Sequence, residues 1–138
     1  MHDNQLLLRV ILKNYKSIAA CDVTLPNLAF LVGKNGSGKS NFLDALRFTR
    51  DALRNSLDNA LRERGGLGEV RRRSGGHPTH FGIRLELRLP SGDLAKYVFE
   101  IGARTGGTYS VQRELCVINS KSTTFSFDVR SGEVVSQH

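Results

Sequence analysis

The first 32 residues alternate between apolar segments and short polar turns. Apolar residues dominate positions 6–12 and 18–25, and the polar stretch 13–17 separates them. This pattern predicts two short β-strands joined by a turn. A second turn at Pro26-Asn27 precedes five consecutive apolar residues at 28–32. A short continuous apolar run bounded by turn residues is typical of a strand buried on both faces, and we expect one there.

After residue 40 the spacing of the apolar positions changes to three, four or seven. The leucines that carry this period are Leu43, Leu46, Leu53, Leu57 and Leu61. The period predicts an amphipathic helix of about twenty residues that starts near Asn41 and ends at Gly65-Gly66, where glycine favours termination.

The second half of the chain has the alternation of half-buried strands. It runs through 80–89 and 95–103, with a turn of Pro, Ser, Gly and Asp between them, and predicts a β-hairpin. Two further strands are indicated at 109–119 and 123–130. We therefore expect an α/β (α+β) fold, with a mixed sheet, one long helix against it and an antiparallel second half.

Composition places the chain among folded domains. The 138 residues are 39% hydrophobic and 24% charged, with a mean hydropathy of −0.28. This excludes a disordered tail, a collagen-like repeat and a membrane-embedded protein, and the length predicts one domain with its own core.

Two features bear on the compartment. Cys21 and Cys116 lie far apart, without a CxxC motif or a histidine at metal-binding spacing, and indicate free thiols in a reducing compartment. We find neither the pattern of a secretory leader nor an apolar run of about 20 residues. The expected location is cytoplasmic, with no membrane partner.

The charge is strongly basic and unevenly distributed. Lysine and arginine number 20 against 13 acidic residues, a net charge of +7. Residues 47–84 contain nine arginines, no lysine and four acidic residues, so most of the surplus lies there. A surplus of this kind predicts a polyanionic partner without naming it.

Residues 33–40 have the spacing G-x-x-x-x-G-K-S and are called the glycine loop below. Glycines allow successive N–H groups to turn inward and cradle phosphate oxygens, and the helix that follows adds its unpaired N–H groups. Lys39 is placed to reach the β- and γ-phosphates, and the Ser40 hydroxyl to ligate Mg²⁺. The residues expected to form the pocket are Gly33, Asn35, Gly36, Ser37, Gly38, Lys39, Ser40 and Asn41. No guanine-reading N-K-x-D and no D-x-x-G switch occur in the chain, so the motif does not indicate a GTPase.

Two longer stretches carry a family resemblance. The sequence LKNYKSI at 12–18, followed by LVGKNGSGKSNFLDAL at 31–46, resembles the N-terminus of SMC/RecF-type ATPases. These belong to the ABC-type ATPase class, with AAA_21-like predicted ATPases and overcoming-lysogenization-defect (OLD) proteins. Lys34 departs from the family pattern, in which proline is common at that position. Beyond residue 50 the resemblance is one of pattern rather than of motif.

The resemblance implies a fold, a cofactor and partners. The fold is the first lobe of an ABC-type head, a P-loop NTPase core beside an antiparallel β subdomain, and the cofactors are ATP and Mg²⁺. Residues 1–64 would hold the strands, glycine loop and helix, 65–80 a Gly/Arg-rich loop, and 81–138 the β subdomain. We expect a fragment of a larger ATPase, completed by a C-terminal lobe or a second subunit, which dimerises across ATP.

Hydrolysis in this family also needs a Walker B strand, a serine-glycine signature and a switch histidine. The segment 97–100 lacks the Walker B aspartate and alternates like a hairpin strand, which makes Glu100 a strand carboxylate. Residues 73–77 resemble the signature only in composition. Gln112 or Gln137 could be the glutamine that links the metal to the second lobe in this family, but each is more simply explained as a solvated polar residue. We assign no catalytic residue and expect little or no ATP hydrolysis by residues 1–138 alone.

The arginines after the helix have two readings. Arg71, Arg72 and Arg73 could contact a DNA backbone, since many relatives act on DNA, or form a solvated loop. Arg62 or Arg64 could instead approach the nucleotide phosphates, and spacing does not choose between them.

Three functions follow from these residues. The first is an ATPase lobe that acts in DNA maintenance or anti-phage defence. The second is a nucleotide-gated switch that controls dimerisation or DNA binding without turnover. The third is a small-molecule kinase, for which the β-rich half offers no evident acceptor pocket or lid.

Overall fold

A computed structural model describes residues 6–74 and 79–137. It contains one seven-stranded sheet with the strand order β2-β1-β3-β4-β5-β6-β7, and every adjacent pair is antiparallel. The strands are β1 (Leu7–Tyr15), β2 (Ile18–Thr24), β3 (His80–Arg88), β4 (Leu94–Ala103), β5 (Tyr109–Asn119), β6 (Thr124–Arg130) and β7 (Glu133–Gln137). The helices are α1 (Lys39–Arg54), α2 (Leu57–Arg62), α3 (Leu67–Val70) and the 3₁₀ turn η1 (Thr105–Gly107).

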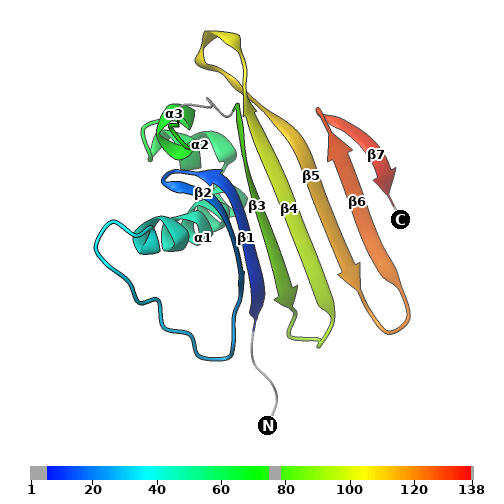
Figure 1. The fold of residues 1–138 in the computed structure, drawn as a ribbon. Helices are drawn as coiled ribbons and strands as arrows, with labels where there is room; N and C mark the ends of the chain where they lie inside the picture. The colour runs from blue at the N-terminus through cyan, green and yellow to red at the C-terminus, as the bar shows by residue number, and fades with distance from the viewer. Residues whose placement is uncertain (1–5, 75–78, 138) are drawn as a thin grey trace.

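The helices cover one face of the sheet at its β1–β4 end, and β5, β6 and β7 extend beyond them (Figure 1). The core between the layers is built from alternate residues of the strands and one face of α1. Phe48 of α1 is fully buried, and its ring lies 5.6 Å from that of Phe81 and 6.0 Å from that of Tyr15. Such edge-to-face contacts add to the burial of apolar area, so Phe48 holds α1 against the sheet.

The antiparallel half of the chain follows the sequence expectation closely. The hairpin β3–β4 and the strands β5 and β6 are confirmed. The alternation is clearest in β3, where Phe81, Ile83 and Leu85 are buried under the helices and the residues between them point to the other face. The last strand, β7, was not predicted. It is short and mostly exposed, with Val134 65% and Val135 59% accessible, so it carries little alternation.

The helix prediction was right in position and wrong in continuity. The helical region ends at residue 54 and restarts at Leu57, where the Ser56 hydroxyl accepts a hydrogen bond from the Asn59 amide at 3.1 Å. A serine in this position caps a new helix, and the cap signal interrupts the leucine period. The short helix α3 also lies inside the stretch expected to be a loop.

The expected strand at 28–32 is wrong for this structure. These residues form no strand, and Phe30 is 80% and Val32 90% exposed. A strand buried on both faces needs a sheet neighbour, and all seven strands of the described residues pair with one another instead. Since the sheet is antiparallel throughout, the expectation of a mixed sheet is wrong here as well.

Two expectations about the compartment have structural counterparts. Cys21 and Cys116 are free thiols, each half-buried in the sheet. Within the described residues, no helix has the length and apolar character needed to cross a bilayer.

Candidate functional site

The glycine loop joins the exposed segment 28–32 to the first turn of α1. Its backbone favours glycine at two places. Gly36 has φ +80°, and Gly38, which caps α1, has φ +96°. Both lie in the left-handed region that side chains disfavour. The motif glycines therefore set the path of this loop.

The Lys39 ammonium lies inside the curve of the loop. It donates to the carbonyl oxygens of Gly33 and, at 2.8 Å, Lys34, and lies 3.4 Å from the Ser37 hydroxyl. A cation surrounded only by oxygens of its own loop has no carboxylate partner there. It is therefore available to an anion that offers stronger acceptors.

The positive end of the helix dipole at the start of α1 also has no negative or capping side chain beside it. No side chain caps it, and its first turn contains no acidic residue. The first intrahelical hydrogen bond runs from the Phe42 amide to the Gly38 carbonyl, at 2.9 Å. The amides of Lys39, Ser40 and Asn41 come before it and have no acceptor within the helix. Free amides and the positive end of a 16-residue helix favour a bound anion at this end.

The turn between β1 and β2 holds the start of α1 in place. The Asn41 amide group donates to the Ser17 hydroxyl at 2.6 Å, and the Lys16 ammonium lies 2.7 Å from Asp44. Lys16 adopts a positive φ of 48°, as does Asn14 with 53°, which makes this turn tight. The stretches 12–18 and 31–46, which carry the family resemblance, therefore meet in space.

Asp44 is the centre of a charged network behind the loop. Its carboxylate accepts from the Tyr15 hydroxyl at 2.7 Å and pairs with Arg64 at 3.1 Å. Burial alone would raise the pKa of Asp44, but hydrogen bonds from Lys16 and Tyr15 and the charge of Arg64 hold that pKa below its usual value. Arg64 also pairs with Asp51 at 3.0 Å and stacks 5.3 Å from the centre of the Phe48 ring.

The partners of Arg62 and Arg64 bear on a question that the spacing left open. The Arg64 side chain is only 10% exposed and is held by two carboxylates, so it supports the packing of α1 and α2. Arg62 is exposed and pairs with the side chain of Asn59, on its own helix. An approach of Arg62 or Arg64 to nucleotide phosphates therefore stays a prediction.

Beside the first turn of α1 lies a pocket of about 440 Å³, which we call the arginine pocket. Its lining residues are Lys16, Ser17, Asn41, Arg64, Glu69, Arg71 and Arg73. The segment after α3 reaches this place because the Lys16 amide bonds to the Val70 carbonyl at 2.7 Å and the Arg72 amide to the Asn14 carbonyl at 2.8 Å. Arg73 pairs with Glu69, and Arg71 forms an isolated bridge with Tyr15.

The other candidate residues lie as follows. Asn35, Gly36 and Ser40 are exposed along the loop and at the start of α1. Glu100 lies in β4, within the antiparallel hairpin, so the strand reading of 97–100 is confirmed. The Gln112 amide group donates to Ser110 at 2.7 Å, and Gln137 is exposed in β7. The signature-like segment extends to His77, and residues 75–78 lie outside the described part of the chain.

Sequence reasoning missed the supporting residues. Ser17 and Asp44 stand inside the two stretches that carry the resemblance, but nothing in their spacing indicates that they meet α1 and Arg64. Among the residues described, no group of three or more histidine, cysteine or acidic side chains is arranged to hold a metal ion. Ser40 as a ligand of Mg²⁺ stays a prediction.

Comparison with known proteins gives two findings. A family model described as "AAA domain, putative AbiEii toxin, Type IV TA system" matches residues 28–128. The "DNA replication and repair protein RecF" of Vibrio vulnificus, strains YJ016 and CMCP6, is 46% identical over 41 residues in each case. These alignments cover 29% of this chain and 11% of the RecF chains, so the likeness to RecF is local.

The family match begins just before the glycine loop and ends in β6, and it takes in the helices and most of the sheet. It covers well over half of the chain. The protein belongs to the AAA_21 family of AAA domains, and its similarity to RecF supports an N-terminal region of the ABC-type P-loop ATPases.

Proposed function

We propose that this chain is the ATP-binding lobe of an SMC/RecF/OLD-like ABC-type ATPase. The observation that carries the proposal is the start of α1, where the Lys39 ammonium has only neutral acceptors and three backbone amides make no intrahelical hydrogen bond. Membership of an AAA domain family supports nucleotide as the ligand.

The residues present fit a triphosphate with Mg²⁺. The ammonium of Lys39 is held only by neutral oxygens, and phosphate oxygens are stronger acceptors because they carry charge. The exposed Ser40 hydroxyl would ligate Mg²⁺, which spreads the negative charge of the phosphates when bound. Asn35, Ser37 and Asn41 would complete the pocket.

The arginine pocket has a proposed role beside this site. Arg71 and Arg73 line it together with Asn41 of α1, so they would add positive charge next to a bound nucleotide. Contact of Arg71, Arg72 and Arg73 with a DNA backbone is the alternative. Replacing all three by glutamine should weaken ATP binding in the first case. It should weaken DNA binding and its salt dependence in the second.

The rest of the ATPase would come from a C-terminal lobe or a second subunit. Leu28, Phe30 and Val32 are 72%, 80% and 90% exposed, so this apolar segment has no cover in the structure. The match to RecF also covers 11% of that protein. We propose that the missing lobe packs on 28–32 and that the complete protein dimerises across ATP.

For the biological role we propose DNA maintenance, which the printed name of the RecF relatives supports. Anti-phage defence is the second candidate, since the family description includes a toxin of a toxin–antitoxin system. A nucleotide-gated switch without turnover would use the same residues, and a change of oligomeric state with ATP but without hydrolysis would distinguish it.

The test is calorimetric titration of the 138-residue chain with ATP in the presence of Mg²⁺. Replacing Lys39 with alanine should lower the affinity at least about tenfold, because a hydrogen bond to a charged group is worth about 1.5–3 kcal/mol. Lys34→Ala is the matched control, since this lysine stands in the same loop and its ammonium has no partner among the described residues.

Circular dichroism spectra should show that both variants keep the fold. Unchanged ATP affinity in a folded Lys39→Ala variant would contradict the site. An equal loss in both variants would show that ATP binds through the net charge of the loop rather than through Lys39.

A further inference from the structure

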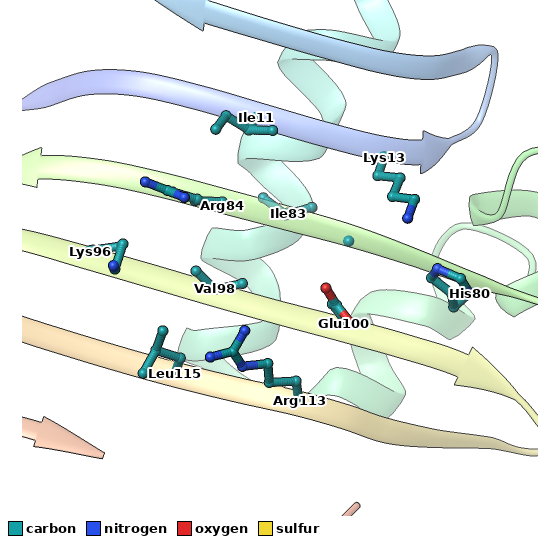
Figure 2. A pocket seen from close by; sticks show the side chains of 11 residues that line it. Ile11, Lys13, His80, Ile83, Arg84, Lys96, Val98, Glu100, Arg113 and Leu115 are labelled. Carbon is teal, nitrogen blue, oxygen red and sulfur yellow. The ribbon is translucent and has the colours of Figure 1, made fainter. Parts of the chain in front are cut away.

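The face of the sheet opposite to the helices carries a depression of about 330 Å³, which we call the outer depression. In Figure 2 the helices lie behind the sheet and the side chains of this face lie in front. Strand register builds the depression from two rows of neighbouring residues. One row is Lys13, Gly82, Glu100 and Arg113, and the other is Ile11, Arg84, Val98 and Leu115.

The floor of the depression is apolar and has a gap. Ile11, Val98 and Leu115 lie in the second row, and Gly82 has no side chain to fill the first. A Cβ at Gly82 would lie 3.3 Å from the Cγ atom of Glu100. The gap between the side chains of Lys13 and Glu100 therefore exists because Gly82, which lies between them, has no side chain. Its volume is in the range of small-ligand pockets, about 300–1,000 Å³.

Cationic side chains surround this floor. Figure 2 shows the nitrogen-bearing ends of Arg84, Lys96 and Arg113 around Val98, with Lys13 and the Glu100 carboxylate on the far side. Across four strands spaced about 4.8 Å apart, such a set spans roughly 14 Å. That span matches a ligand of the size of a nucleotide or a smaller phosphate ester.

The ion pairs show which of these charges lack a partner. Arg84 pairs with Glu86, and Arg113 pairs with Asp128 at 3.1 Å. In the part of the chain that is described, Lys13, Lys96 and Glu100 have no ion-pair or hydrogen-bond partner for their side chains. The two lysines are therefore the cations of this face that are free to meet an anion.

We propose that the outer depression binds a small organic phosphate, no larger than a nucleotide. Lys96 and Arg84 hold the phosphate group at one end, and the floor covers the apolar part. Lys13 and Glu100 meet polar groups of the ligand at the other end, where Glu100 accepts a hydrogen bond from a hydroxyl or amino group. This site shares no residue with the glycine loop, so it stands independently of the proposed ATPase function.

The acidic residues of this face favour a small ligand over a nucleic acid. Asp22, Glu86 and Asp128 neutralise neighbouring arginines, so the cations form no continuous track for a phosphate backbone. The unpaired Glu100 would repel a polyanion but would recognise a donor on a small molecule.

The test uses AMP and inorganic phosphate as probes, titrated into the folded Lys39→Ala chain so that the glycine loop does not contribute. We expect AMP to bind and to shift the amide NMR signals of Gly82 and Glu100. AMP should bind more tightly than phosphate, because only AMP covers the floor. The double variant Lys13→Gln/Lys96→Gln should lose at least about tenfold in AMP affinity.

Glu100→Gln distinguishes recognition from general attraction. It should weaken AMP binding and leave phosphate binding unchanged or tighter, since a repulsive charge is removed. Lys121→Gln, an exposed lysine in the turn between β5 and β6, is the control and should change nothing.

Three results would overturn the proposal. These are no binding of AMP at millimolar concentration, an affinity that the double lysine variant does not change, and a loss of equal size in the Lys121 variant. Displacement of AMP by a 20-base-pair DNA duplex, with an affinity that falls steeply with salt, would show a nucleic-acid surface instead.

Discussion

At the scale of single residues, Asp44 connects the glycine loop to the rest of the molecule. It receives the Tyr15 hydroxyl from β1, the Lys16 ammonium from the β1–β2 turn and the Arg64 guanidinium from beyond α2. Two segments far apart in sequence, 15–16 and the residue Arg64, therefore meet at one carboxylate of α1, four residues after Ser40. A half-buried carboxylate with this many donors is stabilised in its charged form.

Asp44→Asn should destabilise the fold at pH 7 by about 1–3 kcal/mol, because two cations lose their partner. The pKa of Asp44 in the folded state lies below that of an unfolded aspartate, which is about 3.9. Its contribution is therefore complete above about pH 4 and is lost as the pH falls through the folded pKa. Urea denaturation at pH 7, 5 and 3 checks this.

The difference in unfolding free energy between the wild type and Asp44→Asn should be constant from pH 7 to 5 and smaller at pH 3. Other carboxylates with lowered pKa values, such as Asp22 and Asp128, titrate in both proteins and cancel in this comparison. A difference that stays constant down to pH 3 would mean that Asp44 does not form these ion pairs.

At the scale of elements, local sequence determines some segments and not others. The hairpin of β3 and β4 could be predicted from the alternation of apolar residues, such as Phe81 and Ile83, with the residues between them. Such alternation indicates a strand in a sheet that is covered on one face. The break at Ser56 could have been found from its helix-capping residue type, but the leucine period continued through it. The position of Arg71 beside Asn41 depends on backbone pairing with residues 14–16, and no local pattern encodes such a contact.

The segment 28–32 shows most clearly what local sequence cannot predict. Its composition is that of a buried strand, and in the 138 residues it is exposed. Sequence pattern reports what a segment is able to bury, whereas structure depends on whether a neighbour is present. This segment is therefore the place on which we propose that a further element packs.

A pair of phenylalanine variants tests this difference. Phe30→Ser should change the unfolding free energy of the 138-residue chain by no more than about 0.5 kcal/mol, because Phe30 is 80% exposed. Phe48→Ala should cost about 3–5 kcal/mol, since the ring is fully buried against Tyr15 and Phe81. Urea denaturation followed by circular dichroism measures both. A loss of more than about 2 kcal/mol for Phe30→Ser would place that ring inside the fold.

At the scale of the whole molecule, the two faces of the sheet have different tasks. One face holds α1 and so positions the glycine loop at the β1–β2 end, while the other carries the outer depression (Figures 1 and 2). Binding a nucleotide needs only the loop and the start of α1. Hydrolysis needs more, because a group must orient the attacking water and the metal needs ligands beyond a serine hydroxyl.

The described residues do not provide those groups near Ser40. The first turn of α1 contains no acidic residue, and Asp44 is already paired with Lys16 and Arg64. We therefore expect the 138-residue chain to bind ATP with Mg²⁺ and to release phosphate no faster than ATP in buffer alone. A phosphate-release assay over hours measures this, with Lys39→Ala as the reference for contaminating activity. Turnover that is present in the wild type and abolished in Lys39→Ala would show that the chain holds a complete catalytic site.

If turnover instead appears only when a C-terminal lobe is supplied, the missing carboxylates come from that lobe. Phe30→Ser should then reduce this turnover, because it weakens the contact of the lobe with residues 28–32.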